Sequence, residues 1–251
     1  MRYIASIVGF ILIAACSTVQ SQQSNGNPVS HEKFTELLQD HVGSDGFVDY
    51  KGFKKDREKL NSYLELLKST APNKNWSDEE QIAYWINVYN AFTIDLVLQH
   101  YPVKSIKDIG SSIQVPFVNT PWDIKFIEIG GETYDLNNVE HGILRKKWEE
   151  PRIHFAVNCA SYSCPKLRNE AFTAEKLNEQ LDEQAKDFIN DDFRNDITKN
   201  KAELSKIFDW FSGDFKNKMP VREFINQYAD VKIGENTKVT YKEYDWKLNE
   251  Q

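Results

Sequence analysis

The sequence lacks several features that would each assign it to a common class. No apolar run in it reaches the about 20 residues that a membrane-spanning helix needs. The 31 basic and 38 acidic residues give a net charge of −7 and form no basic stripe, which argues against nucleic-acid binding. There are only three cysteines, at positions 16, 159 and 164, so each can be considered individually. No internal repeat is visible, and one domain is therefore expected.

The first residues resemble the signal peptide of a bacterial lipoprotein. A short apolar run from Ile4 to Ala15 follows Arg2, as in the apolar core of a secretory signal. It ends in two small residues and Cys16, the pattern at which a signal peptidase cleaves before a lipidated cysteine. We therefore predict a signal peptide over 1–15 and a lipid anchor on Cys16, although an ordinary signal peptide with an incidental cysteine is the alternative. Because Ser17 rather than aspartate follows, the outer membrane is favoured over the inner one.

Beyond the anchor, the chain divides into a tether and one domain. Residues 16–30 are polar, small and free of charge, which is typical of a flexible tether. Residues 31–251 contain nearly all of the 6 Trp, 11 Tyr and 15 Phe, enough aromatic surface to build a large core. We expect a globular domain there, held at a membrane in the bacterial cell envelope.

Apolar periodicity predicts a helix-rich α+β domain with a small antiparallel sheet. Ser77 and Glu80 form a capping box that starts a helix reaching to just before Pro102, apolar on nearly all sides and so expected at the centre. Asn87 and Asn90 lie on it, and we expect them to hold neighbouring loops or to orient a catalytic group. The other expected elements are helices at 31–42, 52–69, 138–148 and 173–190, a hairpin at 126–136, and strands at 153–157 and 238–241.

Polar and reactive residues concentrate between positions 137 and 167. They include Asn137, Asn138, Glu140, His141, His154, Asn158, Cys159, Ser161, Ser163 and Cys164. Here the chain resembles the domain of unknown function 547 family, through NCASYSCPKL at 158–167, WINVYNAFTI at 85–94 and LNNVEHGILR at 136–145. Further matches are GFVDY at 46–50, FDWFSGDF at 208–215 and YDWKLN at 244–249, so the resemblance runs from about 32 to 249. It implies one intact domain, but the family name implies no reaction.

A first interpretation of these residues is a cysteine nucleophile. Cys159 would attack, His141 or His154 would act as base, and Glu140 or Asn158 would orient the imidazole. The ingredients resemble papain-like and transglutaminase-like enzymes, in which the cysteine precedes the histidine. No histidine follows Cys164, so only a permuted arrangement is compatible with this sequence.

Two other interpretations remain open at this stage. His141, His154, Cys159 and Cys164 are four competent zinc ligands, although neither pair has the usual two-residue spacing. Alternatively, Cys159 and Cys164 form a disulfide in the oxidising envelope and close a small structural loop.

These observations lead to one functional hypothesis and one rival. The hypothesis is a thiol-dependent hydrolase or acyl transferase that acts on envelope peptides through Cys159 and needs no cofactor. The rival is a non-enzymatic binding or scaffolding lipoprotein, with a peptide or protein partner and a Cys159–Cys164 disulfide.

Overall fold

The longest helix, α4 (Asp78–His100), begins at the capping box that the sequence predicts. Ser77 Oγ accepts from the Glu80 amide at 3.1 Å, and the Glu80 carboxylate accepts from the Ser77 amide at 2.6 Å. All residues from 81 to 98 are buried, so α4 is the central helix of the domain. Pro102 follows two residues after its end and cannot continue it.

The computed structural model describes residues 26–110 and 120–251. Its α-helices are α1 (Glu32–His41), α2 (Tyr50–Lys55), α3 (Arg57–Ser69), α4, α5 (Arg145–Lys147), α6 (Leu177–Ile189), α7 (Ile207–Trp210), α8 (Ser212–Lys216) and α9 (Val221–Tyr228). A π-helix, η3 (Asn138–Leu144), leads into α5, and 3₁₀ turns lie at η1 (Ile106–Asp108), η2 (Pro121–Asp123), η4 (Pro151–Phe155) and η5 (Ala174–Lys176). The predicted signal peptide, and the predicted tether up to residue 25, lie outside the described residues. Within the described ranges, no helix combines the length and the apolar character needed to span a bilayer.

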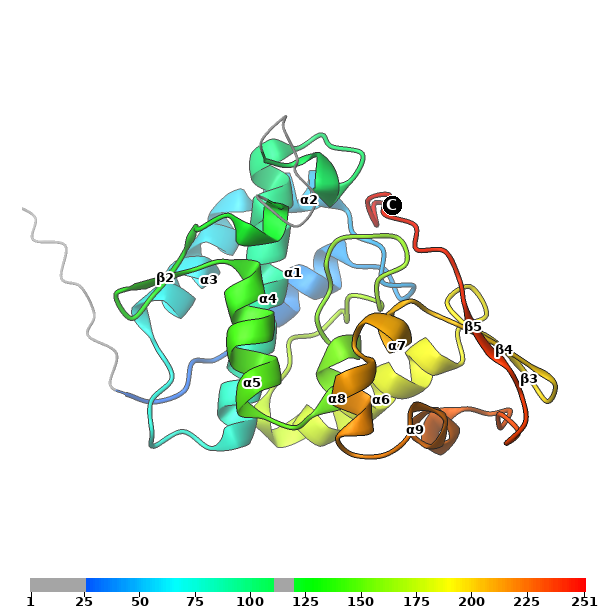
Figure 1. The fold of residues 1–251 in the computed structure, drawn as a ribbon. Coiled ribbons are helices and arrows are strands. Elements are labelled where there is room, and N and C mark those ends of the chain that lie inside the picture. The colour runs from blue at the N-terminus through cyan, green and yellow to red at the C-terminus, as the bar shows by residue number, and fades with distance from the viewer. Residues whose placement is uncertain (1–25, 111–119) are drawn as a thin grey trace, which may run out of the picture.

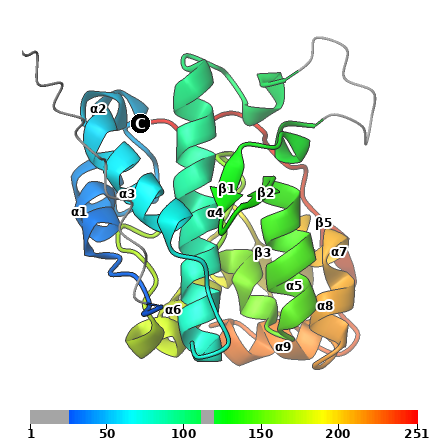
Figure 2. The same ribbon diagram turned by 90° about the vertical axis from the view of Figure 1, so that its left-hand side faces the viewer.

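Two apolar cores stand side by side. Figure 1 shows the whole fold, and Figure 2, turned by 90°, shows α4 upright with α1, α2 and α3 on one side and α5 and α8 on the other. The larger core surrounds α4. The smaller one contains residues of α6, α7, α8 and α9, and Phe155 contacts the rings of Phe188, Phe208, Phe215 and Phe224 within it.

In the described part of the chain, five short strands make two small sheets. The predicted hairpin is confirmed as β1 (Ile127–Ile129) and β2 (Glu132–Tyr134), whose turn residues Gly130 and Gly131 have φ of 62° and 86°. In the other sheet, β3 (Asp196–Thr198) is antiparallel to β4 (Lys201–Leu204), and β5 (Val239–Tyr241) is parallel to β4. The helix-rich α+β class is therefore confirmed, with the addition that one sheet is mixed.

Two predicted elements differ in the structure. The helix expected over 52–69 is two helices, α2 and α3, because the chain leaves helical geometry at Asp56. The strand expected at 153–157 is wrong: the segment begins with the 3₁₀ turn η4. Pro151 presets helical φ at its first position, and the Glu150 side chain accepts from the Arg152 amide at 3.0 Å.

Burial of His31 makes a testable contribution to acid stability. Its Nδ1 lies 2.7 Å from the Tyr63 hydroxyl, and burial lowers the pKa of His31 to about 4. As the pH falls, the imidazole of the unfolded chain takes up a proton near pH 6.5, whereas that of the folded chain does so only near pH 4. The free energy of unfolding therefore falls by roughly 3 kcal/mol between about pH 6.5 and about pH 4. A His31→Gln variant should lose less stability over this window in urea unfolding. His100→Gln, at an exposed site, is the matched control, and an equal loss in both variants would contradict the assignment.

Candidate functional site

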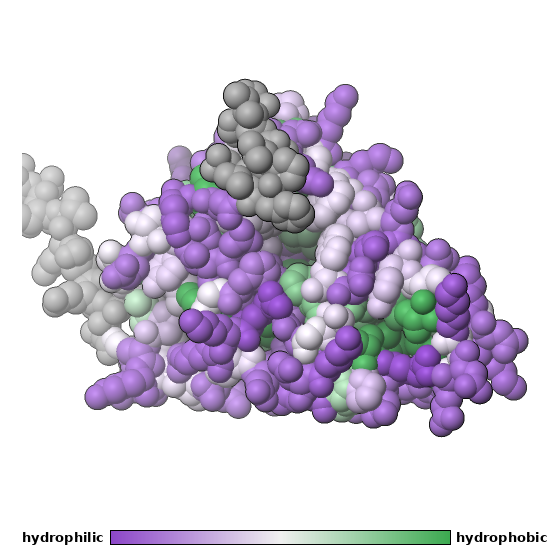
Figure 3. Space-filling view, in the orientation of Figure 1, coloured by the Kyte–Doolittle hydropathy of each residue, from purple (hydrophilic) through white to green (hydrophobic). Residues whose placement is uncertain are grey.

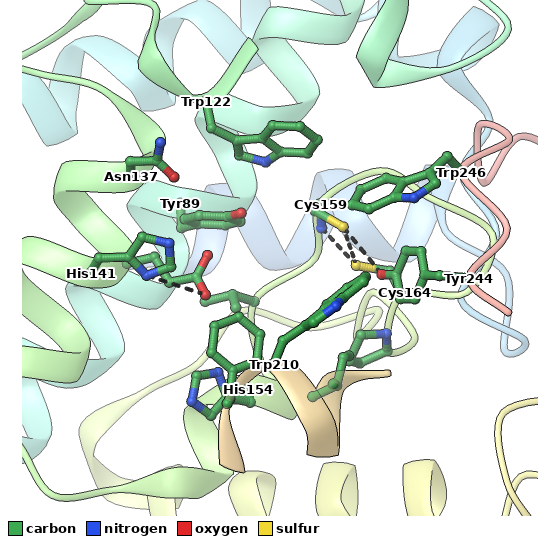
Figure 4. A pocket seen from close by; sticks show the side chains of 15 residues that line it. Tyr89, Trp122, Asn137, His141, His154, Cys159, Cys164, Trp210, Tyr244 and Trp246 are labelled. Atoms are coloured by element: carbon green, nitrogen blue, oxygen red, sulfur yellow. Dashed lines mark hydrogen bonds and ion pairs between the residues drawn. The ribbon is translucent and has the colours of Figure 1, made fainter. Parts of the chain in front are cut away.

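One cavity of about 180 Å³ collects most of the sequence-predicted site residues. It lies between η3, η4, α7 and the C-terminal segment and is shown in close-up in Figure 4. Figure 3 shows the face on which it opens, where pale and green side chains gather amid a mostly purple surface. Its lining residues are Tyr89, Trp122, Asn137, Glu140, His141, His154, Val157, Cys159, Cys164, Pro165, Ile207, Trp210, Phe211, Tyr244 and Trp246. Asn158 is not among them.

The two cysteines lie together on one wall of the cavity. Both are free cysteines in the structure, and their sulfurs are 2.8 Å apart. The Cys159 amide donates to Cys164 Sγ at 2.9 Å. Cys159 Sγ also lies 3.3 Å from Ser161 Oγ and 3.5 Å from Tyr244 Oη. No imidazole is among the hydrogen-bond partners of Cys159 in the described residues, so the histidine base of the sequence hypothesis is not in contact with it.

These contacts shift the pKa values of the two thiols in opposite directions. The hydrogen bond to Cys164, together with burial, raises the pKa of Cys159. Burial alone would raise the pKa of Cys164 as well, but the hydrogen bonds that Cys159 donates outweigh it, so that pKa is lowered. The pair therefore holds one proton more tightly than the other, with the first negative charge on Cys164 Sγ.

A set of buried amides holds the cysteine loop in place. Asn158 accepts from the Ala160 amide at 2.9 Å and from Asn249 Nδ2 at 3.2 Å, and donates to the Pro165 carbonyl at 2.7 Å. Asn90 on α4 accepts from the Asn158 amide at 2.8 Å. The predicted role of Asn90 in holding a loop is thus confirmed, and the Asn158 side chain holds the loop that carries both cysteines.

The backbone next to Cys159 is held in an uncommon conformation. Ala160 has a φ of 58°, in the left-handed region that residues with a Cβ rarely adopt. Such a conformation persists only where the surroundings impose it, and here Asn158 and the C-terminal segment do so. Local strain directly after a cysteine is common at functional sites, although it does not by itself identify one.

The C-terminal segment completes the cavity, which sequence reasoning did not anticipate. The Tyr162 amide donates to the Lys247 carbonyl at 2.7 Å, so this segment runs beside the cysteine loop. It brings Tyr244 and Trp246 to the cavity, and Ser161 Oγ donates to Tyr244 Oη at 3.0 Å. The YDWKLN motif contained both residues, but nothing in it indicated a neighbour more than 80 positions away.

The predicted His141 lies on the opposite side of the cavity from the sulfurs (Figure 4), and the predicted Glu140, which precedes it on η3, also lines the cavity. Glu140 is buried, and burial raises its pKa although His141 and Arg145 oppose the shift. Arg145 Nη1 lies 3.0 Å from His141 Nδ1 and can only donate, so Nδ1 accepts and the imidazole carries its proton on Nε2. His141 Nδ1 is 3.8 Å from Glu140 Oε1. Both residues come from η3, and π-helical turns are frequent at functional sites.

His154 is held by an acid that the sequence analysis missed. Its Nε2 lies 2.8 Å from Asp214 Oδ2, and its ring stacks on Phe211 at 4.0 Å between centroids. Arg145 donates to the two carboxylate oxygens of Asp214 at 2.5 and 2.9 Å. Burial lowers the pKa of His154 against the opposing effect of Asp214, so this histidine is neutral. Asp214 lies in the FDWFSGDF motif, which was the one signal that could have indicated it.

The four residues considered as zinc ligands do not form a compact ligand set in the structure. Among residues 26–110 and 120–251, one group of three potential ligands has its atoms within 4.8 Å of one another, and it is Asp40, His41 and Asp56. His154 is instead bonded to Asp214, and the cysteines to each other.

Comparison with known proteins yields one family and no characterised relative. Residues 73–189 match the model of a family described as "Protein of unknown function, DUF547". The matched stretch contains α4, the π-helix and both cysteines of the cavity. No curated protein and no solved structure gives a match. The family match therefore supports, over this central part of the chain, the resemblance to the domain of unknown function 547 family that the motifs indicated.

Proposed function

We propose that the protein is a thiol-dependent hydrolase or acyl transferase that acts on peptides, with Cys159 as the nucleophile. One observation carries the proposal: the Cys159 thiol lies 2.8 Å from Cys164 Sγ on the wall of a cavity that also contains a buried acid, Glu140. A nucleophilic thiol requires a base within hydrogen-bonding distance, and the Cys164 thiolate provides one. The base of the sequence hypothesis, His141, is thereby replaced by the second cysteine.

The reaction follows from this pairing. Cys159 Sγ attacks the carbonyl carbon of a peptide while its proton moves to Cys164 Sγ. A sulfur–carbon bond forms, the carbon–nitrogen bond breaks, and the leaving amine takes the proton back from Cys164. Water then releases the acyl group as an acid, or a second amine releases it as a new amide.

We place this activity in the bacterial cell envelope, with the domain tethered to the membrane, preferably the outer membrane, by lipid on Cys16. The support is the sequence alone, through the short apolar run that ends in two alanines and a cysteine. The lipid would hold the domain near envelope peptides. Radiolabelled fatty acid incorporated by the full chain, and lost in a Cys16→Ser variant, is the expected outcome.

A second candidate function rests on the same short distance between sulfurs. In an oxidising envelope the two thiols are placed to form a disulfide, and the domain would then be a binding or scaffolding lipoprotein without a nucleophile. Counting thiols in protein isolated without reductant separates the two candidates. Two free thiols support the enzyme, and a complete Cys159–Cys164 disulfide supports the scaffold.

The enzyme proposal is tested by trapping the acyl intermediate. Incubation of the full chain with an activated peptide ester should add the acyl mass to the tryptic peptide that contains Cys159. The Cys159→Ser variant should form this adduct at least about 10³-fold more slowly, because a serine hydroxyl is not ionised near neutral pH. Adduct formation on lysines alone, at equal rates in both proteins, would refute the proposal.

A further inference from the structure

A continuous wall of aromatic rings lines the side of the cavity next to the cysteines. The ring centroids of Trp210 and Tyr244 are 4.8 Å apart, those of Tyr244 and Trp246 4.6 Å, and those of Trp246 and Trp122 5.6 Å. Trp210 is 47 % exposed, an unusual degree for a tryptophan, so much of its surface is open to a ligand. Lys107 Nζ already lies 4.6 Å from the centre of the Trp246 ring, as an ammonium group does over an electron-rich face.

The charges on the other side of the cavity favour a cation. Glu140 is buried and receives a hydrogen bond from Tyr89, but no lysine or arginine is among the described residues that line the cavity. The nearby Arg145 is committed to Asp214 through two hydrogen bonds. His141 Nδ1, at 3.8 Å, is a distant partner for the buried Glu140 carboxyl group, and a ligand ammonium group beside that carboxyl would offset the cost of burying its charge.

We infer that the cavity binds the side chain of a lysine-type residue, with its ammonium group beside Glu140 and its carbon chain along Trp210 and Trp246. This inference rests on the proposed function, since it names the peptide group that the thiol enzyme recognises. A long aliphatic chain with a terminal amine matches both walls at once: the rings take the methylene groups, and the carboxylate takes the charge.

The test compares two probes of the same carbon skeleton. Nα-acetyl-lysine methylamide carries the amine, and Nα-acetyl-norleucine methylamide lacks it. Binding is measured by calorimetry and by tryptophan fluorescence on the full chain with Cys159→Ser, so that no covalent step contributes. The lysine probe should bind at least about 10-fold more tightly, and Glu140→Gln should remove this preference. Trp210→Ala, at an exposed position that tolerates truncation, should weaken both probes to a similar degree.

Two outcomes would overturn the inference: equal binding of the two probes, or a lysine preference that persists in Glu140→Gln. The binding experiment uses a protein without the nucleophile. Its result therefore tests the lysine preference even if no acyl intermediate can be trapped. Conversely, acylation of Cys159 by neutral peptides with no lysine preference would keep the enzyme and reject the ligand.

Discussion

Replacing Cys164 with serine is expected to slow acylation of Cys159 by about 10²-fold at pH 7, the usual contribution of a general base. A serine hydroxyl at this position can still accept the Cys159 amide, but it cannot take up the thiol proton. The rate should recover as pH rises, because the isolated Cys159 thiol then ionises into solvent without help. Acylation measured from pH 6 to 10 by stopped-flow and mass spectrometry gives both the rate and its pH profile.

Because Cys164 is the proposed base, the slower acylation of Cys159 is expected for Cys164→Ser and not for variants of the histidines. His141→Gln should reduce the rate much less, since its Nδ1 is occupied by Arg145 and no contact joins it to the sulfur. Unchanged affinity for the lysine probe in Cys164→Ser would show that the cavity is intact. If Cys164→Ser is acylated as fast as the unmodified chain and His141→Gln is acylated slowly, the base is His141 and not Cys164.

The second large effect concerns stability: Asn158→Ala is expected to cost about 3–5 kcal/mol of unfolding free energy. The side chain makes three hydrogen bonds in a buried position, and each partner left unpaired costs about 1–3 kcal/mol. The left-handed Ala160 would also lose the contact with Asn158 that helps to hold it. Urea denaturation followed by far-UV circular dichroism measures the change.

An exposed asparagine serves as the reference for this substitution. Asn61 lies on the solvent side of α3, and Asn61→Ala should change the unfolding free energy by no more than about 0.5 kcal/mol. A loss below about 1 kcal/mol for Asn158→Ala would mean that the loop is held by its backbone contacts alone. The same variant should also lose the acylation of Cys159, because the two sulfurs would no longer be held together.

Local sequence patterns predicted the parts of this fold whose causes are local. The capping box at Ser77 and the glycine turn of the hairpin depend on residues within a few positions, and both are present as predicted. The prediction of a strand at 153–157 is wrong because alternating apolar residues over five positions do not distinguish a strand from a short helical turn. Pro151, two positions before this segment, presets the helical φ with which η4 begins.

In the candidate site, too, the residues that were predicted are those that lie close together in the sequence. Glu140, His141 and the two cysteines were found because reactive residues cluster in one stretch of sequence. Trp210, Asp214 and the Tyr244–Trp246 wall reach the cavity from segments 50 to 90 positions away, and pairings of that range leave no periodic trace. The proposal that Cys164 is the base depends on a sulfur–sulfur distance that only the folded loop sets.

Residues 48–50 and residues 249–251 contact each other, and this contact has a consequence for the order of folding. Asn249 bonds both Asn158 and the Tyr50 hydroxyl, and the backbone of residues 249 and 251 pairs with Val48. Contacts between residues about 200 positions apart close the largest loops in the chain, and such loops form late in folding. The cysteine pair would therefore gain its acid–base partnership only once both ends have met. Until then Cys159 also lacks its contact with Tyr244, which comes from the same C-terminal segment.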